Sequence, residues 1–357
     1  MVEHRAVLLT VSGEIPHDLD NQVCEGRRPR ADYAVMRDAF DADLVDVRVA
    51  LASTGALGRI IRRVAGVGPL LAWFCFLNRK RYDVIVTDGE QVGIPFALLA
   101  RLAGRGRARH MMIVHILSTR SKQLVIRSAR LASRIDRYVV YSSSQRDFVV
   151  ERLGVPVEKV VLSTFMVDTA FFDPGQVGVE RERMICTAGL ERRDYATLLD
   201  AVKGLDVRVV IAAASPWSTR SDSTSGRELP TNVEVRRLSL FELRELYAAS
   251  WFVVMPLDDV QFQAGITTIL EAMAMGRAVV CTRTAGQTDT IVDGETGLYV
   301  PPGDARALRS ALEKLLDEPH LANSMGDSAR RWVVEHADVD RYADRLLHEL
   351  ESLRASR

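Results

Sequence analysis

Short runs of apolar and β-branched residues alternate along the first half of the chain with longer segments whose apolar residues recur at helical spacing. The runs that read as strands are Ala6–Val11, Leu44–Val49, Asp83–Asp88, Met111–Ile116 and Tyr138–Ser142. They lack strict alternation of apolar and polar residues, as is typical of strands covered on both faces. The helix-like segments between them are Ala31–Phe40, Gly93–Leu102 and Lys122–Ser133. This order predicts an α/β domain with a parallel sheet between two layers of helices.

The same alternation of predicted strands and helices begins again in the second half of the chain. Its predicted strands are Met184–Ala188, Val207–Ala213, Val233–Arg236, Phe252–Leu257, Ala278–Thr282 and Leu298–Val300. Its predicted helices are Tyr195–Val202, Leu240–Ala249, Thr268–Met275 and Ala305–Leu316. Pro and Gly interrupt the pattern at Phe172–Glu180, so we expect domains at 1–175 and 176–337, with 338–357 a C-terminal helix that packs back on the first domain. Because ligands of doubly wound sheets bind beyond the strand ends, the cleft between two such domains is the expected site.

Composition narrows the class of protein. Of 357 residues, 47% are hydrophobic and 26% charged, which is typical of a globular enzyme and too apolar for disorder. No run approaches the roughly 18 apolar residues of a membrane-spanning helix, and the first residues lack the pattern of a secretory leader, so we expect a cytoplasmic protein. The four cysteines are scattered, which favours buried free thiols over a disulfide framework or a metal site.

Charge is distributed unevenly although the net charge is zero. Residues 1–175 hold 25 Lys and Arg against 19 Asp and Glu, a net charge of +6, and the remainder holds 22 against 28, a net charge of −6. This asymmetry supports two domains and suggests that the first meets something anionic. Nucleic acid is not the expected partner, because the basic residues are not interleaved with aromatic residues on which bases could stack.

The stretch Gln263–Gly276 (QAGITTILEAMAMG) is the first candidate for chemistry. It follows a predicted strand and begins a helix, whose first amides suit an anion or a sugar hydroxyl. Gly265 would let the backbone approach a ligand, and Glu271 could accept two vicinal hydroxyl groups. The alternative is a capping box from Thr268 to Glu271, in which the carboxylate serves only the start of the helix.

The residues that follow resemble the donor-binding half of retaining GT-B glycosyltransferases of the group 1 class. The matching residues, in order and spacing, are Glu271-Ala-Met-Ala, Gly276, Asp293-Gly294, Gly297-Leu298, Val300 and Pro302-Gly303-Asp304. The close match covers about 45 residues, and the rest of the chain agrees in architecture. The resemblance implies a GT-B fold of two Rossmann-like domains that face a cleft, with the nucleotide-sugar in the second domain.

The resemblance also implies roles for single residues. Glu271 would hold the ribose of a nucleotide-sugar. The sugar hydroxyls and the diphosphate would be held by the loop of Ala264, Gly265, Ile266, Thr267 and Thr268. The family has a glutamate eight positions before Glu271, where this chain has Gln263. An amide keeps hydrogen-bonding capacity without charge, so donor binding is still expected, whereas a role that requires a carboxylate at this position is in doubt.

A basic pair after the first strand of the second domain is the family's diphosphate site. Arg193 stands where the family usually has lysine; the usual upstream arginine is replaced by Leu190, with Arg192 close enough to substitute. Guanidinium groups suit phosphate oxygens, although the segment ERRD could also be a solvated turn. Base recognition in the family uses the segment that here contains Leu238, mostly through backbone groups.

The first domain offers fewer candidates. The family places a histidine near the reacting sugar at a strand end, and His115 occupies that position, although a structural histidine is an equal alternative. The first loop, normally rich in glycine, here has Gly13. The basic residues Arg27, Arg28 and Arg30 follow and could meet an anionic acceptor or form a solvated loop.

Residues 55–81 carry six basic residues and no acidic residue around an apolar run. The run is too short to span a bilayer. It could lie on an anionic membrane surface, or it could be a core helix with charged ends.

These observations predict a retaining glycosyltransferase that moves a sugar from a UDP- or GDP-sugar to an acceptor hydroxyl without a metal or another cofactor. The acceptor could be lipid-linked, a cell-envelope precursor or a small metabolite. We assign His115, Arg193 and Gln263 to the reaction centre. Two alternatives have the same architecture: an epimerase of nucleotide-sugars, and a non-catalytic protein that binds them.

Overall fold

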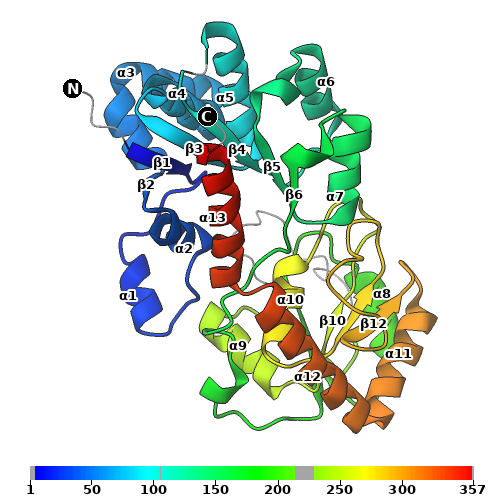
Figure 1. Ribbon diagram of the computed structural model, residues 1–357. Coiled ribbons are helices and arrows are strands. Elements are labelled where there is room, and N and C mark those ends of the chain that lie inside the picture. Colours follow the sequence, from blue (N-terminus) through cyan, green and yellow to red (C-terminus); the bar gives the residue numbers. More distant parts are fainter. Residues whose placement is uncertain (1–4, 105, 214–228, 356–357) are drawn as a thin grey trace. The chain divides into compact units, whose positions relative to one another are not determined.

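The computed structural model describes residues 5–104, 106–213 and 229–355. The chain forms two compact units (Figure 1). Unit 1 comprises residues 1–20, 31–163 and 342–357, and unit 2 comprises residues 21–30 and 164–341. The polar, turn-rich segment at residues 215–232, which the sequence predicts to be a loop, lies largely outside the described residues.

Unit 1 is built on a six-stranded parallel sheet in the order β2-β1-β3-β4-β5-β6. Its strands are β1 Arg5–Thr10, β2 Ala42–Val45, β3 Tyr82–Asp88, β4 Arg109–Ile113, β5 Arg137–Val140 and β6 Val160–Leu162. Its helices are α2 Asp32–Phe40, α3 Val47–Ala65, α4 Val67–Asn78, α5 Glu90–Ala103, α6 Arg120–Ser128 and α7 Ser143–Asp147. Most of α13, Val339–Ala355, also belongs to this unit, where the Tyr342 and Tyr141 hydroxyls are 3.0 Å apart.

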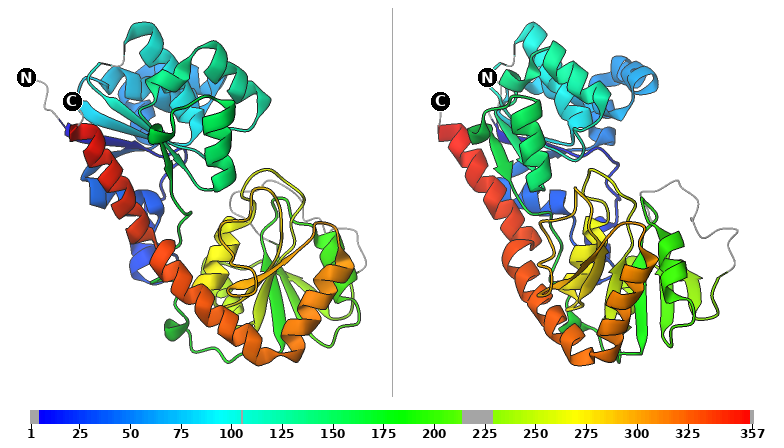
Figure 2. Two further views of the ribbon diagram at one scale, coloured as in Figure 1. Left: turned by 45° about the vertical axis from the view of Figure 1, so that its right-hand side comes forward. Right: turned by 90° about the vertical axis from the view of Figure 1, so that its right-hand side faces the viewer.

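Unit 2 repeats the plan with the strand order β12-β11-β10-β7-β8-β9, again parallel throughout (Figure 2). Its strands are β7 Met184–Ala188, β8 Arg208–Ala212, β9 Val233–Arg236, β10 Phe252–Met255, β11 Val279–Thr282 and β12 Gly297–Val300. Its helices are α8 Tyr195–Val202, α9 Leu240–Ala249, α10 Ile266–Ala274, α11 Ala305–Asp317 and α12 Pro319–His336. A short helix, α1 Leu19–Cys24, lies at the division between the two units. Two doubly wound parallel sheets are therefore present, and the predicted fold class is confirmed.

One predicted strand was too long. Residues Leu44–Val49 were expected to be extended, but β2 ends at Val45 and α3 begins at Val47. The cause is Asp46, whose carboxylate accepts a hydrogen bond of 2.9 Å from the Val49 amide and caps the helix. The β-branched residues that suggested a strand lie in the first turn of α3 instead.

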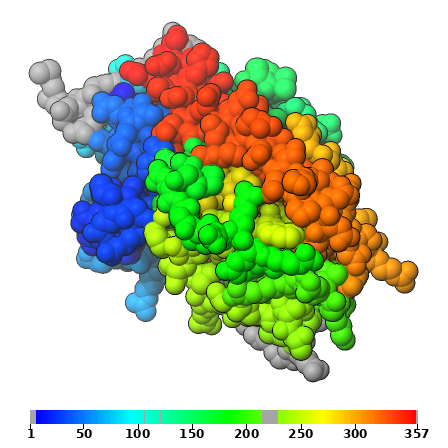
Figure 3. All heavy atoms as spheres, turned by 90° about the horizontal axis from the view of Figure 1, so that it is seen from below, coloured from blue at the N-terminus to red at the C-terminus, as the bar shows by residue number. Residues whose placement is uncertain are grey.

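The division between the units also differs from the predicted boundary at 175–176. Phe172 is 1% exposed and belongs to the core of unit 2, so Phe172–Glu180 lies inside that unit. The segment Asn21–Arg30 groups with unit 2 although it is N-terminal (blue in Figure 3). Arg30 holds it there, because its guanidinium lies 2.8 Å from Asp168 and 2.9 Å from Asp340.

The apolar run at residues 55–81 divides between two helices of different character. In α4 the residues Leu70, Leu71, Phe74 and Phe76 are buried, which corresponds to the core-helix alternative. The preceding helix α3 keeps large apolar residues exposed. In the described part of the chain, no helix combines the length and the apolarity needed to cross a membrane. Of the predicted buried thiols, Cys75, Cys186 and Cys281 are buried, whereas Cys24 is exposed.

Candidate functional site

Two loops meet at the carboxyl ends of β7 and β10, which are neighbours in the sheet of unit 2. The Asp194 amide donates to the Pro256 carbonyl at 3.1 Å, and the Asp258 amide donates to the Arg192 carbonyl at 3.0 Å. These backbone hydrogen bonds fix the turn between β7 and α8 against the loop between β10 and α10. The candidate diphosphate residues and the candidate sugar loop are thereby held at one edge of the sheet.

The start of α10 decides between the two interpretations of Glu271. The N-cap is Gly265, with φ at +75°, and no side chain caps the helix. Thr268 therefore lies within the first turn and Glu271 lies in the second, so the alternative of a capping box from Thr268 to Glu271 is wrong. The amides of Ile266, Thr267 and Thr268 belong to the first turn, where a helix offers donors without intrahelical partners. An anion or a hydroxyl group can occupy such a position.

The loop before α10 is supported by a residue that the sequence analysis did not single out. Gln287 is fully buried, and its Nε2 donates to the Ala264 carbonyl at 3.1 Å. The buried Oε1 of Gln263 has no hydrogen-bond partner among the described residues. Gln287 lies in the polar run between β11 and β12, and neither its residue type nor its spacing distinguished it as a support for this loop.

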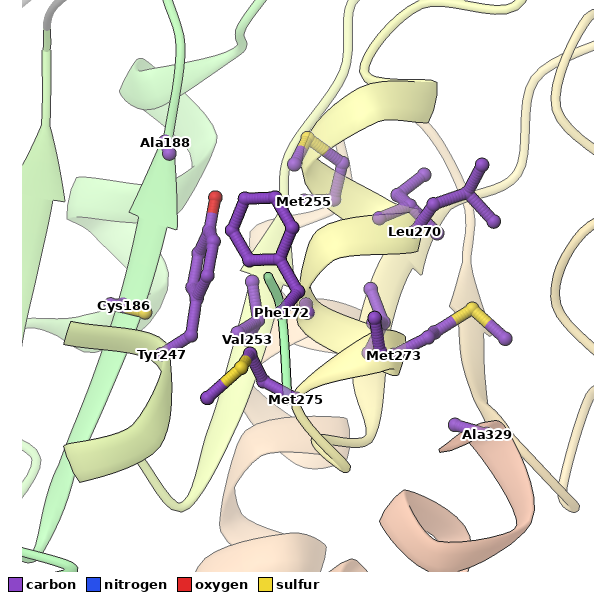
Figure 4. Packing of buried hydrophobic residues seen from close by; sticks show 14 of the residues in the cluster. Phe172, Cys186, Ala188, Tyr247, Val253, Met255, Leu270, Met273, Met275 and Ala329 are labelled. Atoms are coloured by element: carbon purple, nitrogen blue, oxygen red, sulfur yellow. The ribbon is translucent and has the colours of Figure 1, made fainter. Parts of the chain in front are cut away.

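Glu271 is buried, with 6% of its surface exposed, and accepts a hydrogen bond of 3.0 Å from the Tyr247 hydroxyl. Burial raises the pKa of Glu271 to about 7, although the hydrogen bond from Tyr247 and the charge of Arg193 act in the opposite direction. Figure 4 shows the Tyr247 ring beside Phe172, with its hydroxyl directed toward the end of β7 at Ala188. Sequence analysis missed Tyr247, because a tyrosine in an amphipathic helix resembles an ordinary core residue.

The two arginines of the basic pair have different environments. Arg193 is buried, and its Nε and Nη1 donate to the carbonyls of Ala188 and Glu191 at 2.9 and 2.7 Å. Burial lowers the pKa of this guanidinium. Arg192 has a left-handed backbone (φ +55°) and a half-exposed side chain, 4.0 Å from Asp258. Arg192 is thus accessible to a ligand, whereas Arg193 supplies a charge below the surface near Glu271.

Leu238, from the predicted base-reading segment, is half-buried and packs against the hydrophobic core of unit 2. It precedes Ser239, the N-cap of α9, which forms a capping box with Glu242. The side chain of Leu238 therefore has a structural contact, and its backbone groups remain the candidates for contact with a base.

His115 lies just beyond β4 in unit 1, where it meets the residues that follow β3. Its Nε2 is 2.9 Å from Asp88, and its amide donates to Glu90 at 3.0 Å. Glu90 is itself buried and is 2.7 Å from Lys122. Burial alone would lower the pKa of His115, but the hydrogen bond and charge of Asp88, with the charges of Glu90 and Asp32, raise it overall. Asp88 therefore holds the imidazole in place and stabilises its protonated form relative to a free histidine.

The candidate acceptor residues are divided between the two units. Gly13 is an exposed residue of unit 1, with open space around it. Arg27, Arg28 and Arg30 belong to unit 2, where Arg27 pairs with Glu25 at 3.1 Å and stays exposed. Arg30 is committed to Asp168 and Asp340, which favours a structural role over contact with an acceptor. In the described ranges, no group of three His, Cys, Asp or Glu residues is arranged to hold a metal ion.

Two doubly wound parallel sheets of this kind define the GT-B fold. Sucrose-phosphate synthase from Thermosynechococcus elongatus superposes with a TM-score of 0.72 at 17% identity, over 99% of this chain and 100% of that chain. Anabaena HepE, solved in complex with UDP-glucose, superposes with a TM-score of 0.67 at 16% identity, over 98% of this chain and 100% of that chain.

Sequence comparison agrees with this fold. Residues 181–318 match the family model of the glycosyl transferases group 1. D-inositol 3-phosphate glycosyltransferase from Corynebacterium aurimucosum is 29% identical over 234 residues, which cover 58% of this chain and 54% of that protein. Alpha-D-kanosaminyltransferase from Streptomyces kanamyceticus is 27% identical over 243 residues, 65% of this chain and 58% of that protein. The chain thus spans somewhat more than half the length of these relatives.

The first prediction concerns Gly265, which combines a positive φ with close neighbours. A Cβ at this position would lie 2.8 Å from Met255 Sδ. Gly294, with φ +82° and open space, is the matched control because alanine there has only the backbone cost. We expect Gly294→Ala to cost about 1 kcal/mol of unfolding free energy and Gly265→Ala about 1–3 kcal/mol more, measured by urea denaturation. Equal costs would show that the loop relaxes around the added methyl group.

The second prediction concerns the hydrogen bond from Tyr247 to Glu271. The folded pKa of Glu271 lies above its unfolded value of about 4.3, so the folded state holds the proton more tightly. Stability linked to this group is therefore present below about pH 4.3 and is lost as the pH rises toward about 7. Tyr247→Phe should raise the pKa of Glu271 further and cost more stability at about pH 8 than at about pH 5, with a total of about 1 kcal/mol for the lost bond.

Urea unfolding at the two pH values measures this difference. In the Glu271→Gln background the same Tyr247→Phe change should have no such pH dependence. An identical cost at both pH values in the wild-type background would contradict the account, because the tyrosine would then not act on the ionised carboxylate.

Proposed function

We propose that this protein transfers a sugar from a nucleoside diphosphate sugar to an acceptor hydroxyl, with retention at the anomeric carbon and without a metal. The observation that carries the proposal is the edge of the unit 2 sheet. There backbone hydrogen bonds join the loop of the basic pair to the loop that leads into α10, whose uncapped start precedes Glu271, and all of these lie within the segment that matches the family. The arrangement offers a carboxylate, cationic groups and free amides, which complement a ribose, a diphosphate and sugar hydroxyls.

Each group has a distinct proposed role. Glu271 accepts hydrogen bonds from the ribose hydroxyls, with Tyr247 holding the carboxylate in place. The first amides of α10 and the loop from Gln263 to Thr268 bind the sugar hydroxyls and the diphosphate. Arg192 contacts the phosphate oxygens, and Arg193 adds positive charge from below. Gln263 contributes an uncharged amide, so no carboxylate nucleophile is assigned to its position.

The reaction follows from these roles. A bond forms between the acceptor oxygen and the anomeric carbon as the bond from that carbon to the phosphate oxygen breaks. The acceptor proton passes to the leaving phosphate on the same face of the sugar, which accounts for retention. The arginines and the helix amides stabilise the negative charge that develops on the leaving diphosphate. His115, whose imidazole is paired with Asp88, is assigned to the reaction centre as a contact of the sugar.

On the acceptor side we retain Gly13, Arg27 and Arg28 as candidate contacts and remove Arg30, whose guanidinium is already paired. The acceptor class is a lipid-linked, cell-envelope or small-metabolite hydroxyl. We further propose that the reaction takes place in the cytoplasm at a membrane surface. The reason is that residues 55–81 contain basic residues but no Asp or Glu, so they would be attracted to the anionic cytoplasmic leaflet.

The third prediction tests donor binding. Titration calorimetry with UDP, GDP and their glucose and mannose conjugates should give a specific signal with one base. Glu271→Ala should weaken that binding by about tenfold or more, because a buried hydrogen-bond acceptor for the ribose hydroxyls is lost. Glu335→Gln, an exposed change on α12, is the matched control and should bind like the wild type. Unchanged affinity in Glu271→Ala, with the fold intact by circular dichroism, would refute the ribose assignment.

Turnover separates the proposed activity from its two alternatives. A glycosyltransferase releases the nucleoside diphosphate in proportion to glycosylated acceptor. Conversion of the donor sugar without any acceptor would indicate an epimerase. Specific binding of the donor without release or conversion across an acceptor panel would favour a non-catalytic binding protein.

A further inference from the structure

The helix α3 exposes three large apolar residues on one side. Leu57, Ile60 and Val64 are 50%, 59% and 82% exposed. Their spacing of three and four residues places them along a single stripe of an α-helix. Single exposed apolar residues are normal on protein surfaces, but three on one helix face form a continuous patch. We call these three residues the α3 stripe.

Positive charge lies beside the α3 stripe. Arg59 and Arg63 are exposed, and at 100° per residue they are neighbours on the flank next to Ile60. Arg62 is also exposed and lies 3.6 Å from Glu14, with both side chains about half accessible. From residue 47 to residue 82 the sequence has no Asp or Glu. The α3 stripe is therefore bordered by Arg59 and Arg63, and no acidic residue within the segment offsets their charge.

The opposite side of α3 is fixed to the core of unit 1. Gly58 is buried, and a Cβ there would lie 3.2 Å from Leu70 of α4. The neighbouring α4 is itself largely buried. The kink at Gly55, with φ +60°, separates residues 56–65 from the capped start of the helix. The orientation of the stripe is thus set by packing, and α3 lies at the outer edge of unit 1 in Figure 1.

The charge decides which partner fits this surface. A second copy of the chain paired through the same stripe would bring arginines toward arginines, which is unfavourable. The surface of a bilayer that contains anionic phospholipid offers both an apolar boundary and negative charge. A basic amphipathic helix of this length lies in the plane of that interface and does not span it.

We propose that the α3 stripe, with Arg59 and Arg63, docks on an anionic phospholipid membrane by inserting Leu57, Ile60 and Val64 at the level of the headgroups. The surface belongs to unit 1 and contains no residue assigned to the donor site. The docking proposal rests on the membrane location proposed above for residues 55–81, and its failure would leave donor binding and sugar transfer untouched.

Vesicle flotation with the full chain tests the proposal. The vesicles are phosphatidylcholine alone and an equal mixture of phosphatidylcholine with phosphatidylglycerol. We expect binding to the mixed vesicles only, weakened by high salt. The charge variant Arg59→Glu with Arg63→Glu should reduce binding about tenfold or more. The apolar variant Ile60→Glu with Val64→Glu should reduce it to a similar extent, because the inserted area is lost.

The matched control is Arg306→Glu with Arg331→Glu, which makes the same change in net charge at exposed positions of unit 2. It should bind like the wild type. Equal binding by wild type and both α3 variants, or no binding to mixed vesicles, overturns the proposal. So does a wild-type dimer in solution that the apolar variant abolishes, since the stripe would then join two copies. Unchanged thermal unfolding confirms that the exposed substitutions leave the fold intact.

Discussion

The candidate site depends on two backbone hydrogen bonds that join the loops after β7 and β10. They link Asp194 to Pro256 and Asp258 to Arg192, and they place the basic pair beside the start of α10. Neighbouring parallel strands bring the loop ends together, and these hydrogen bonds fix one loop against the other. Gly265 and Gln287 then set the path of the chain into α10. The hydrogen-bond donors and charges of the protein are thus in place before a ligand binds at this edge, so the protein needs little reorganisation.

Most of the fold was predictable from hydrophobic pattern and turn residues. Short apolar runs identified nearly every strand, because strands buried on both faces have a strong compositional signal. The errors occurred where a single polar contact overrides the pattern. Asp46 caps α3 and ends the strand that its β-branched neighbours suggested. Phe172 lies in a segment rich in Gly and Pro that looks like a linker, yet its ring is buried in the core of unit 2. Arg30 attaches an N-terminal segment to that unit through two distant carboxylates.

Residues of the candidate site could be predicted where a sequence motif contains them. They could not be predicted where a side chain from another helix or loop holds the site in place. Glu271 and the basic pair were singled out by the family resemblance, and their roles stay predictions. The capping interpretation failed because the location of the N-cap at Gly265 depends on backbone geometry, which a Thr-x-x-Glu pattern does not specify. Tyr247 of α9 contacts Glu271, and Gln287 from the segment after β11 contacts Ala264. A local sequence pattern does not predict contacts between residues so far apart in the chain. The separation of Arg192 from Arg193 also requires the positive φ of Arg192, since the sequence shows only two adjacent cations.

The central claim is that a nucleoside diphosphate binds at the uncapped start of α10. The most direct measurement is the chemical shift of backbone amides on adding UDP or GDP to the isotopically labelled chain. The account predicts that the amides of Ile266, Thr267 and Thr268 respond together with those of the turn at Gly189–Arg193, in proportion to one binding isotherm. Saturable binding that leaves these amides unchanged and perturbs other segments would contradict it.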